Sequence, residues 1–388
     1  MNFALDDDHR MLRDTARVFL EKEINLDPIL KNPKSTVANS GYAQNWEKVA
    51  ELGWPGLVIP EEYGGSGMTM LDLVMIVQEM GRTVAPTPLL GTLAGTWAVL
   101  KGGSEAQKQK LLPAIAAGET KMAYAVCNAD GSYDGPASDA KVATSGAAGA
   151  LQGPPGWMAS PKIKINGSKS FVVDGASADV LVVAAENGGK RGLYLVDAKQ
   201  PGVETKVLPW KDITREVATV TFKDADAELL ADSDEDIWPW VRDRVILAIA
   251  ADSAGGLQRI IEMSTEYAKE RVAFGKPIGA FQSIKHGLAD SYGTSEASAV
   301  GVLYAAWALS EDNDEGPISA AMAKAYTSDA YCAATHQSIQ IFGAIGFTWE
   351  MKNHLYFKRA RSNAELFGGS ISQRSRVLDL AVGRKAAA

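Results

Sequence analysis

A cation, an aromatic ring and an amide lie close together in one short stretch of this chain, residues 271–290. The stretch contains Arg271, Phe274 and Gln282, followed by Lys285. Arginine presents a planar fork of donors that fits phosphate oxygens, phenylalanine offers a stacking face, and glutamine both donates and accepts. This combination is typical of a site for the diphosphate and adenine of a dinucleotide. An ordinary helix–loop–helix corner would explain the stretch equally well.

The sequence of this stretch resembles a pattern found in a known family. R-x-x-F-G-x-P-I-x-x-F-Q, followed by KHGLAD, is similar to the C-terminal helical domain of acyl-CoA dehydrogenases. QIFGAIGFTWE, at residues 340–350, resembles that family's second flavin-contacting segment. Two such segments in the right order and at the right distance are more specific than either alone. The resemblance covers nearly the whole chain and is weakest between Cys127 and Lys162.

The resemblance implies a cofactor, a substrate and partners. These are FAD, an acyl-CoA, electron-transferring flavoprotein as electron acceptor, and a dimer or tetramer of like or unlike chains. In this family the flavin nucleotide lies across a subunit interface. The resemblance therefore puts Arg271, Phe274 and Gln282 of one chain opposite Gln340 and Gly343 of another.

Composition limits the classes of partner and compartment. The chain has 388 residues and a net charge of −8, which argues against nucleic acid as the main partner. Its N-terminus lacks a signal pattern and no apolar run reaches 18 residues, so we expect a cytoplasmic protein that does not insert into a membrane. The two cysteines, Cys127 and Cys332, form no metal-like pair, and we expect no metal site.

Three regions follow from the period of the hydrophobic pattern. Apolar residues in 1–118 have helical spacing. In 119–230, short segments that alternate between apolar and polar residues, or are rich in β-branched residues, are separated by turn residues. Residues 231–388 again have helical spacing. The predicted fold class is α+β, with an N-terminal helical domain, a middle β-barrel and a C-terminal four-helix bundle, as in acyl-CoA dehydrogenases. The helices of the last region should break at 271–283, 310–317, 342–353 and 367–370.

The barrel's flavin-facing segments differ from the family pattern. Residues 125–130 read AVCNAD where members commonly read A-x-T-E-P-x-A-G-S-D, and residues 170–175 read SFVVDG where members read W-I-T-N-G. Phe171 is the candidate for the aromatic beside the flavin, and a core aromatic is the alternative.

The expected catalytic base is missing. Removing the weakly acidic Cα proton of a CoA thioester needs a carboxylate. Many members carry a Glu near the C-terminus where this chain has Gly368, and others carry it on the preceding long helix, at a position that falls here on Val245. The nearest carboxylates are Asp243, our catalytic candidate, Asp252 and Glu365. Two residues rotate a helix by roughly 200°, so Asp243 serves only if the helix start is shifted.

Three functions therefore stand as hypotheses. The first is an FAD-dependent dehydrogenase of an acyl-CoA with a displaced base. The second is one subunit of a heteromeric acyl-CoA dehydrogenase, in which a paralogous chain provides the base. The third is a flavin- or CoA-binding homologue without redox chemistry. A glycine in place of Glu removes bulk, which favours a bulky or steroid-derived acyl group.

Overall fold

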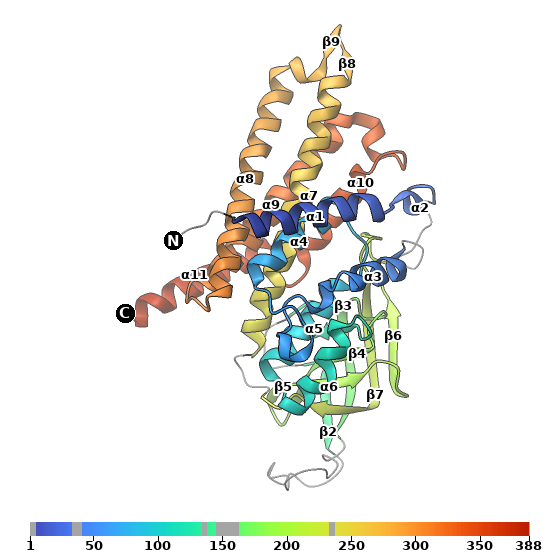
Figure 1. Cartoon of the computed structure of the whole chain (residues 1–388), viewed down its shortest axis with the longest axis vertical. Coiled ribbons are helices and arrows are strands. Elements are labelled where there is room, and N and C mark those ends of the chain that lie inside the picture. Colours follow the sequence, from blue (N-terminus) through green and yellow to red (C-terminus); the bar gives the residue numbers. More distant parts are fainter. Residues whose placement is uncertain (1–4, 33–40, 134–137, 145–162, 233–236, 388) are drawn as a thin grey trace.

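The structure is a computed structural model of the whole chain, and it describes residues 5–32, 41–133, 138–144, 163–232 and 237–387. Three layers follow one another along the chain: helices, a sheet and helices again (Figure 1). The predicted α+β fold class and the order of its three parts are confirmed. Residues 145–162 and 233–236 lie outside the described residues.

The N-terminal helices begin and end at ordinary signals. Thr69 and Asp72 form a capping box at the start of α4, and Ser104 and Gln107 form one at the start of α6. Helix α5 is buried on nearly all sides because it lies between the barrel and the C-terminal helices. The helices of this part are α1 (Asp7–Glu23), α2 (Asp27–Leu30), α3 (Tyr42–Glu51), α4 (Met70–Arg82), α5 (Leu89–Gly102) and α6 (Glu105–Ala116).

The middle strands close into a barrel. Strand β4 pairs with both β2 and β5, and the ring is completed by the pairs β2–β3, β3–β7 and β7–β5. Strands β1 and β6 add to this ring at β4 and β7. The strands are β1 (Met122–Ala125), β2 (Ala140–Thr144), β3 (Ile163–Val173), β4 (Val180–Asn187), β5 (Lys190–Asp197), β6 (Val203–Val207) and β7 (Val217–Leu229). Closure of the ring pairs backbone N–H and C=O groups that the edges of an open sheet would leave exposed.

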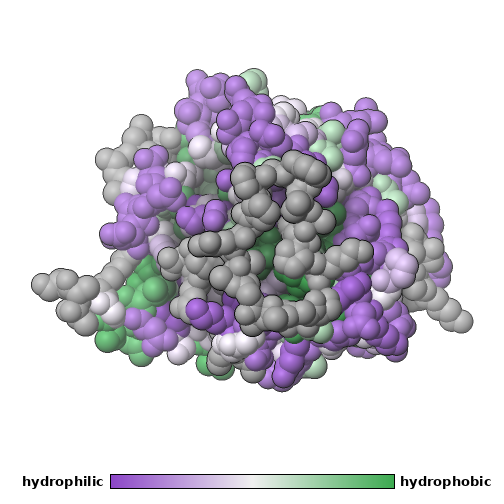
Figure 2. Space-filling view, turned by 90° about the horizontal axis from the view of Figure 1, so that it is seen from below, coloured by the Kyte–Doolittle hydropathy of each residue, from purple (hydrophilic) through white to green (hydrophobic). Residues whose placement is uncertain are grey.

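The C-terminal part is a bundle dominated by three long helices. Its helices are α7 (Ile237–Glu270), α8 (Gln282–Ser310), α9 (Gly316–Phe342), α10 (Asn353–Glu365) and α11 (Ser370–Ala387). All four predicted breaks fall between these helices. Helix α7 passes through the largest hydrophobic core, and the surface seen from the barrel end is mostly hydrophilic with scattered apolar patches (Figures 1 and 2).

The crossing of α4 and α7 depends on two glycines. A Cβ added at Gly255 would lie 1.8 Å from the carbonyl oxygen of Gln78, and one at Gly81 would lie 1.9 Å from that of Asp252. Side chains at either position would therefore force the two backbones apart. This close approach fixes the N-terminal helices against the bundle.

We therefore predict that Gly255→Ala destabilises the chain. Overpacking at such a contact costs roughly 1–3 kcal/mol, so the urea midpoint of unfolding should fall. Gly301→Ala in α8 is the control, because a Cβ there meets nothing within 4 Å and alanine favours a helix by roughly 0.5–1 kcal/mol. An unchanged midpoint for Gly255→Ala would contradict the packing described for this crossing.

Candidate functional site

The Arg271 segment forms the tip of the hairpin between α7 and α8 (Figure 1, top). The chain reverses through two short strands, β8 (Val272–Ala273) and β9 (Lys276–Pro277), and one 3-10 turn, η4 (Ile278–Ala280). The reversal uses Gly275 at φ +78, a left-handed conformation that glycine adopts readily. The backbone N–H of Ile278 donates to the carbonyl of Arg271 at 2.8 Å, which holds the tip against the end of α7.

This tip is exposed, and the side chains of Arg271 and Gln282 lie at its surface. Phe274 is 93% exposed. Neither Arg271 nor Gln282 makes a side-chain hydrogen bond or ion pair to another described residue. An almost fully exposed aromatic ring beside an unpaired guanidinium contributes little to folding, so this tip is suited to contact with another molecule.

The second predicted segment lies at the same end of the same chain. Helix α9 runs antiparallel beside α8 and ends at Phe342, whose ring stacks on Tyr267 of α7 with centroids 4.1 Å apart. Gln340 is exposed, and Gly343 follows with φ +64 and ψ −143, a conformation that favours glycine. Both segments therefore lie at the same end of one chain. That the Arg271 segment of one chain faces the Gln340 segment of another remains a prediction.

The two barrel segments that differ from the family pattern, residues 125–130 and 170–175, are neighbours. The backbone N–H of Ser170 donates to the Cys127 carbonyl at 3.0 Å. Lys169 is 1% exposed, and its ammonium donates to the Val126 carbonyl, Asn128 Oδ1 and Ser138 Oγ at 3.3, 2.7 and 2.6 Å. Burial lowers the pKa of Lys169 to about 8. The ammonium of Lys169 therefore links β3 to residues 126–128 and to Ser138 in this wall of the barrel. Nothing in the sequence around Lys169 distinguished it from a surface lysine.

Phe171 stands in this wall at a β-bulge. The register of β3 against β7 shifts between Lys169 and Val172, and Phe171 has φ +52. Such a conformation is rare for a bulky residue and is often associated with function. The half-buried ring lies 6.2 Å from that of Trp210, whose indole N–H donates to Ser362 Oγ of α10 at 2.8 Å.

Neither expected base position carries a carboxylate. Val245 is fully buried in the core of α7. Gly368 has φ +94, and a Cβ there would lie 3.0 Å from Gln373 Nε2 and 3.2 Å from Ser372 Oγ. The loop therefore disfavours any side chain at this position. Phe367, one residue earlier, points into the interior and is 5% exposed.

The candidate carboxylates lie in different places. Asp243 is 2% exposed and forms an ion pair with Arg376 of α11. Burial raises the pKa of the Asp243 carboxyl above its usual value, although Arg376 opposes this. Asp252 is held by Arg359 Nη1 at 2.9 Å and by Asn363 Nδ2 at 2.6 Å. Glu365 is exposed at the end of α10.

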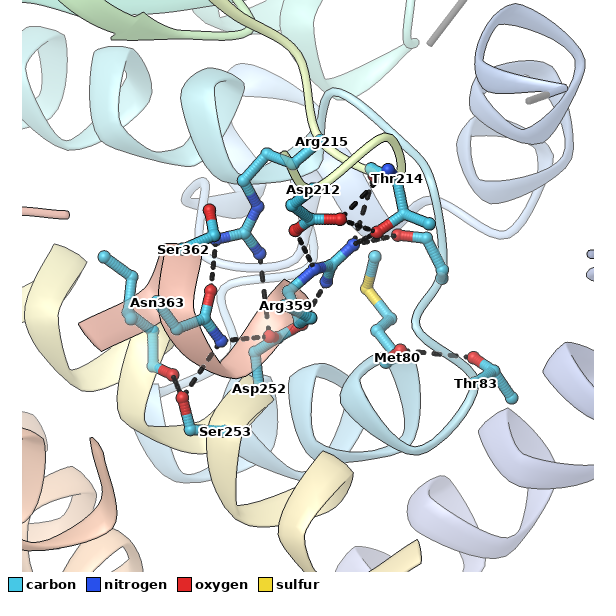
Figure 3. Close-up of polar contacts among 12 residues, drawn as sticks. Met80, Thr83, Asp212, Thr214, Arg215, Asp252, Ser253, Arg359, Ser362 and Asn363 are labelled. Carbon is cyan, nitrogen blue, oxygen red and sulfur yellow. Dashed lines mark hydrogen bonds and ion pairs between the residues drawn. The ribbon is translucent and has the colours of Figure 1, made fainter. Parts of the chain in front are cut away.

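Asp252 belongs to a buried charge network that the sequence did not reveal (Figure 3). Arg359 of α10 donates to Asp212 at 2.7 Å and to Thr214 Oγ1 at 2.7 Å, both in the connection between β6 and β7, and to Asp252 of α7. Arg215 lies 3.6 Å from the second oxygen of Asp252. Both oxygens of Asp252 are engaged by cations or an amide, so this carboxylate is poorly suited to accept a substrate proton.

Comparison with known proteins decides the family. Models of the acyl-CoA dehydrogenase N-terminal domain and of its C-terminal domain match residues 6–119 and 245–380. The chain is 30% identical over 370 residues to acyl-CoA dehydrogenase IpdE2 of Mycolicibacterium smegmatis. The alignment covers 94% of this chain and 96% of that protein. The chain belongs to the acyl-CoA dehydrogenase family.

Solved structures agree with this assignment. A steroid ACAD, Tcur3481-Tcur3483, superimposes with a TM-score of 0.81 at 26% identity, covering 98% of this chain and 99% of that one. An FAD-dependent dehydrogenase gives a TM-score of 0.83 at 26% identity, with the same coverage. This acyl-CoA dehydrogenase is therefore an oxidoreductase that acts on the CH–CH bond of acyl-CoA thioesters and uses FAD.

The exposed end of this acyl-CoA dehydrogenase fits the nucleotide half of FAD. The guanidinium of Arg271 suits the diphosphate, the Phe274 ring suits adenine, and the amides of Gln282 and Gln340 offer both donors and acceptors. When bound, FAD supplies the acceptor for the hydride that leaves Cβ.

In the part of the chain that the structure describes, we find no helix both long and apolar enough to cross a bilayer.

We predict that Arg271→Ala weakens FAD binding. The variant leaves the diphosphate charge uncompensated, which costs roughly 1.5–3 kcal/mol for a charged hydrogen bond, or about a 10- to 150-fold loss of affinity. Retained FAD after dilution and gel filtration reports it directly. Arg10→Ala, an exposed arginine on α1, is the control. Wild-type FAD occupancy in Arg271→Ala would count against the assignment.

Proposed function

We propose that this chain is the base-less subunit of a mixed acyl-CoA dehydrogenase. It presents its exposed nucleotide-binding end to FAD in a neighbouring chain of related sequence. That neighbour provides the carboxylate that takes the Cα proton. The observation that carries the proposal is that Gly368 and Val245 occupy the two base positions and that both buried carboxylates, Asp243 and Asp252, are paired with an arginine. The remaining candidate, Glu365, is exposed, with Oε2 3.6 Å from where a Cβ on Gly369 would lie.

The base position supports the proposal in physical terms. A general base must reach its proton within hydrogen-bond distance and must have a lone pair available. The backbone conformation of Gly368 excludes a simple exchange for Glu, and Val245 faces a packed core. The two buried candidates, Asp243 and Asp252, are each committed to an arginine.

The exposed end supports the other half of the proposal. Arg271, Phe274, Gln282, Gln340 and Gly343 form one outward-facing group that needs a second chain to complete a site. A homo-oligomer needs both this end and a complete interior site in one sequence. A mixed oligomer can divide them between two sequences, so each can diverge separately.

We further propose that the acyl group is bulky or steroid-derived and that electrons leave to electron-transferring flavoprotein. The likeness to a steroid ACAD at 26% identity over nearly the whole chain favours the first part. The chain is also similar, at 25% identity and a TM-score of 0.86, to a structure solved in a study of the electron-transferring flavoprotein of Acidaminococcus fermentans. This similarity is compatible with the second part.

Co-expression tests the mixed oligomer. The chain is produced alone and together with a paralogue encoded beside it, and native mass and FAD content are measured on both preparations. We expect stoichiometric FAD and acyl-CoA-dependent bleaching of the flavin only in the mixed assembly. A lone chain that forms a fully flavinylated homo-oligomer and oxidises an acyl-CoA would refute the proposal.

One observation favours a second candidate, a homo-oligomer in which Asp243 is the displaced base. Its carboxyl is deeply buried and its pKa is raised by that burial, as is common for catalytic carboxylates. Its ion pair with Arg376 argues the other way, since an adjacent cation keeps a carboxylate charged but occupied.

Asp243→Asn separates the two candidates. If Asp243 is the base, flavin reduction by acyl-CoA should fall by ~10²–10⁴-fold while FAD and ligand remain bound. Under the mixed-oligomer proposal we expect a rate within a few-fold of wild type, measured by stopped-flow bleaching. Asp329→Asn is the matched control, because it removes a carboxylate that pairs with another α11 arginine, Arg374.

A further inference from the structure

A small cavity lies between α4, α5 and α7, beside the buried charge network of Figure 3. Its volume is about 30 Å³, close to the share of one molecule in liquid water. Most of its wall is apolar and includes Val77, Met80, Leu89, Leu93 and Ala248. The polar side chains of the wall are all buried and belong to Thr87, Arg215, Asp252 and Arg359. The cavity therefore has room for one polar atom among hydrocarbon groups.

The hydroxyl of Thr87 is available to this cavity. Thr87 is 8% exposed, and its Oγ1 is buried without a hydrogen-bond partner among the described residues. A buried hydroxyl that makes no hydrogen bond costs folding free energy, so its presence in the wall needs an explanation. A threonine hydroxyl can both donate and accept. Thr87 can therefore bind an oxygen of either kind, a ketone or a hydroxyl.

The segment that carries Thr87 is held in place on both sides. One proline precedes Thr87 and another follows it, and each restricts its own φ. Asn45 Nδ2 donates to the Pro86 carbonyl at 3.0 Å, and the backbone N–H of Gly91 donates to Asp174 Oδ2 at 2.7 Å. A segment fixed in this way loses little conformational freedom when a ligand binds.

The charges at the cavity already have partners. Arg359 donates to Asp212 at 2.7 Å and to Asp252 at 2.9 Å. Arg215 lies 3.6 Å from Asp252 and donates to Asn363 Oδ1 at 2.6 Å. An anionic ligand would be buried near Asp252 without a cation of its own, and burying an unpaired charge is costly. A neutral oxygen meets no such cost.

We propose that this cavity binds a neutral oxygen, a ketone or a hydroxyl, at the end of an apolar group, and that Thr87 selects it. The apolar wall packs on the carbon that carries the oxygen, and the Thr87 hydroxyl hydrogen-bonds the oxygen itself. The oxygen belongs either to the acyl group of a CoA thioester or to a free ketone or alcohol. The proposal goes beyond the proposed function and does not rest on it, because binding to this chain needs no catalytic base.

Two matched pairs of probes test the site on the purified full-length protein. The first pair is 7-oxooctanoyl-CoA and octanoyl-CoA, measured by calorimetry. The second is 2-pentanone and 2-methyl-1-pentene, in which a CH₂ group replaces the ketone oxygen, measured by NMR titration. We expect the ketone of a pair to bind roughly 2- to 10-fold more tightly, as one neutral hydrogen bond allows. A preference confined to the thioesters identifies an acyl group, and a preference in the second pair identifies a free ligand.

Variants of Thr87 assign the preference to its hydroxyl. Thr87→Val removes the hydroxyl at nearly constant volume, so the affinity ratio of ketone to match should fall to about one. Thr87→Ser keeps a hydroxyl and should keep the preference. Thr96→Val is the matched control, because Thr96 is a buried threonine of α5 outside the cavity wall, and its hydroxyl donates to the Thr92 carbonyl at 2.8 Å. That variant should also keep the preference.

Urea unfolding separates a binding role from a structural one. Thr87 Oγ1 has no described partner to lose, so Thr87→Val should leave the unfolding midpoint unchanged or raise it, whereas Thr96→Val should lower it. A fall in the Thr87→Val midpoint would show a structural role for the hydroxyl and would overturn the proposal. Equal affinities within both wild-type pairs, or a ketone preference that survives in Thr87→Val, would overturn it too. Each of these results leaves the mixed oligomer intact.

Discussion

The buried guanidinium of Arg359 is the interaction on which the rest of the structure depends. It extends from α10 and contacts Asp212 and Thr214 of the barrel, Asp252 of α7 and the Ala85 carbonyl between α4 and α5 (Figure 3). A buried charge is tolerated only when every donor finds a partner. All three parts of the chain must therefore come together at once, and the crossing of α4 and α7 at Gly81 and Gly255 brings them close enough to do so.

From this fixed junction the molecule extends in two functional directions. Toward the tip, α7, α8 and α9 carry an aromatic ring and unpaired polar groups out to the surface, where folding gains little from them. Toward the interior, the charges of Asp243 and Asp252 are neutralised and Tyr133 packs on Phe367. A general base needs a carboxylate with an available lone pair, whereas both buried candidates in this chain are paired with an arginine. That contrast is the physical basis for the proposal that this chain supports the chemistry of another.

Much of the fold was predictable from the sequence, and the reasons are local. The breaks near 275, 313, 347 and 368 coincide with glycine, proline or asparagine, and the alternating segments between residues 119 and 230 became the strands of a closed barrel. The residues proposed to contact the FAD nucleotide were predicted from two short segments, around Arg271 and Gln340, because each segment resembles the family's pattern over consecutive residues.

Long-range pairings were not predictable in this way. Arg359 and Asp252 are 107 residues apart, and a buried Lys169 or Lys324 looks like a surface lysine in sequence. The position of Gln340 beside the Arg271 hairpin depends on how α9 returns along α8, which the hydrophobic period does not specify. The stacking of Tyr133 on Phe367 was not predictable either, because the two rings meet only through the packing of the barrel on the bundle.

A structure of the flavin-loaded assembly tests the central claim most directly. The account predicts FAD whose ADP half contacts Arg271 and Phe274 of this chain while its flavin ring lies in the neighbouring chain. A flavin ring lying against Phe171 of this chain, with an acyl group between the ring and Gly368, would contradict it.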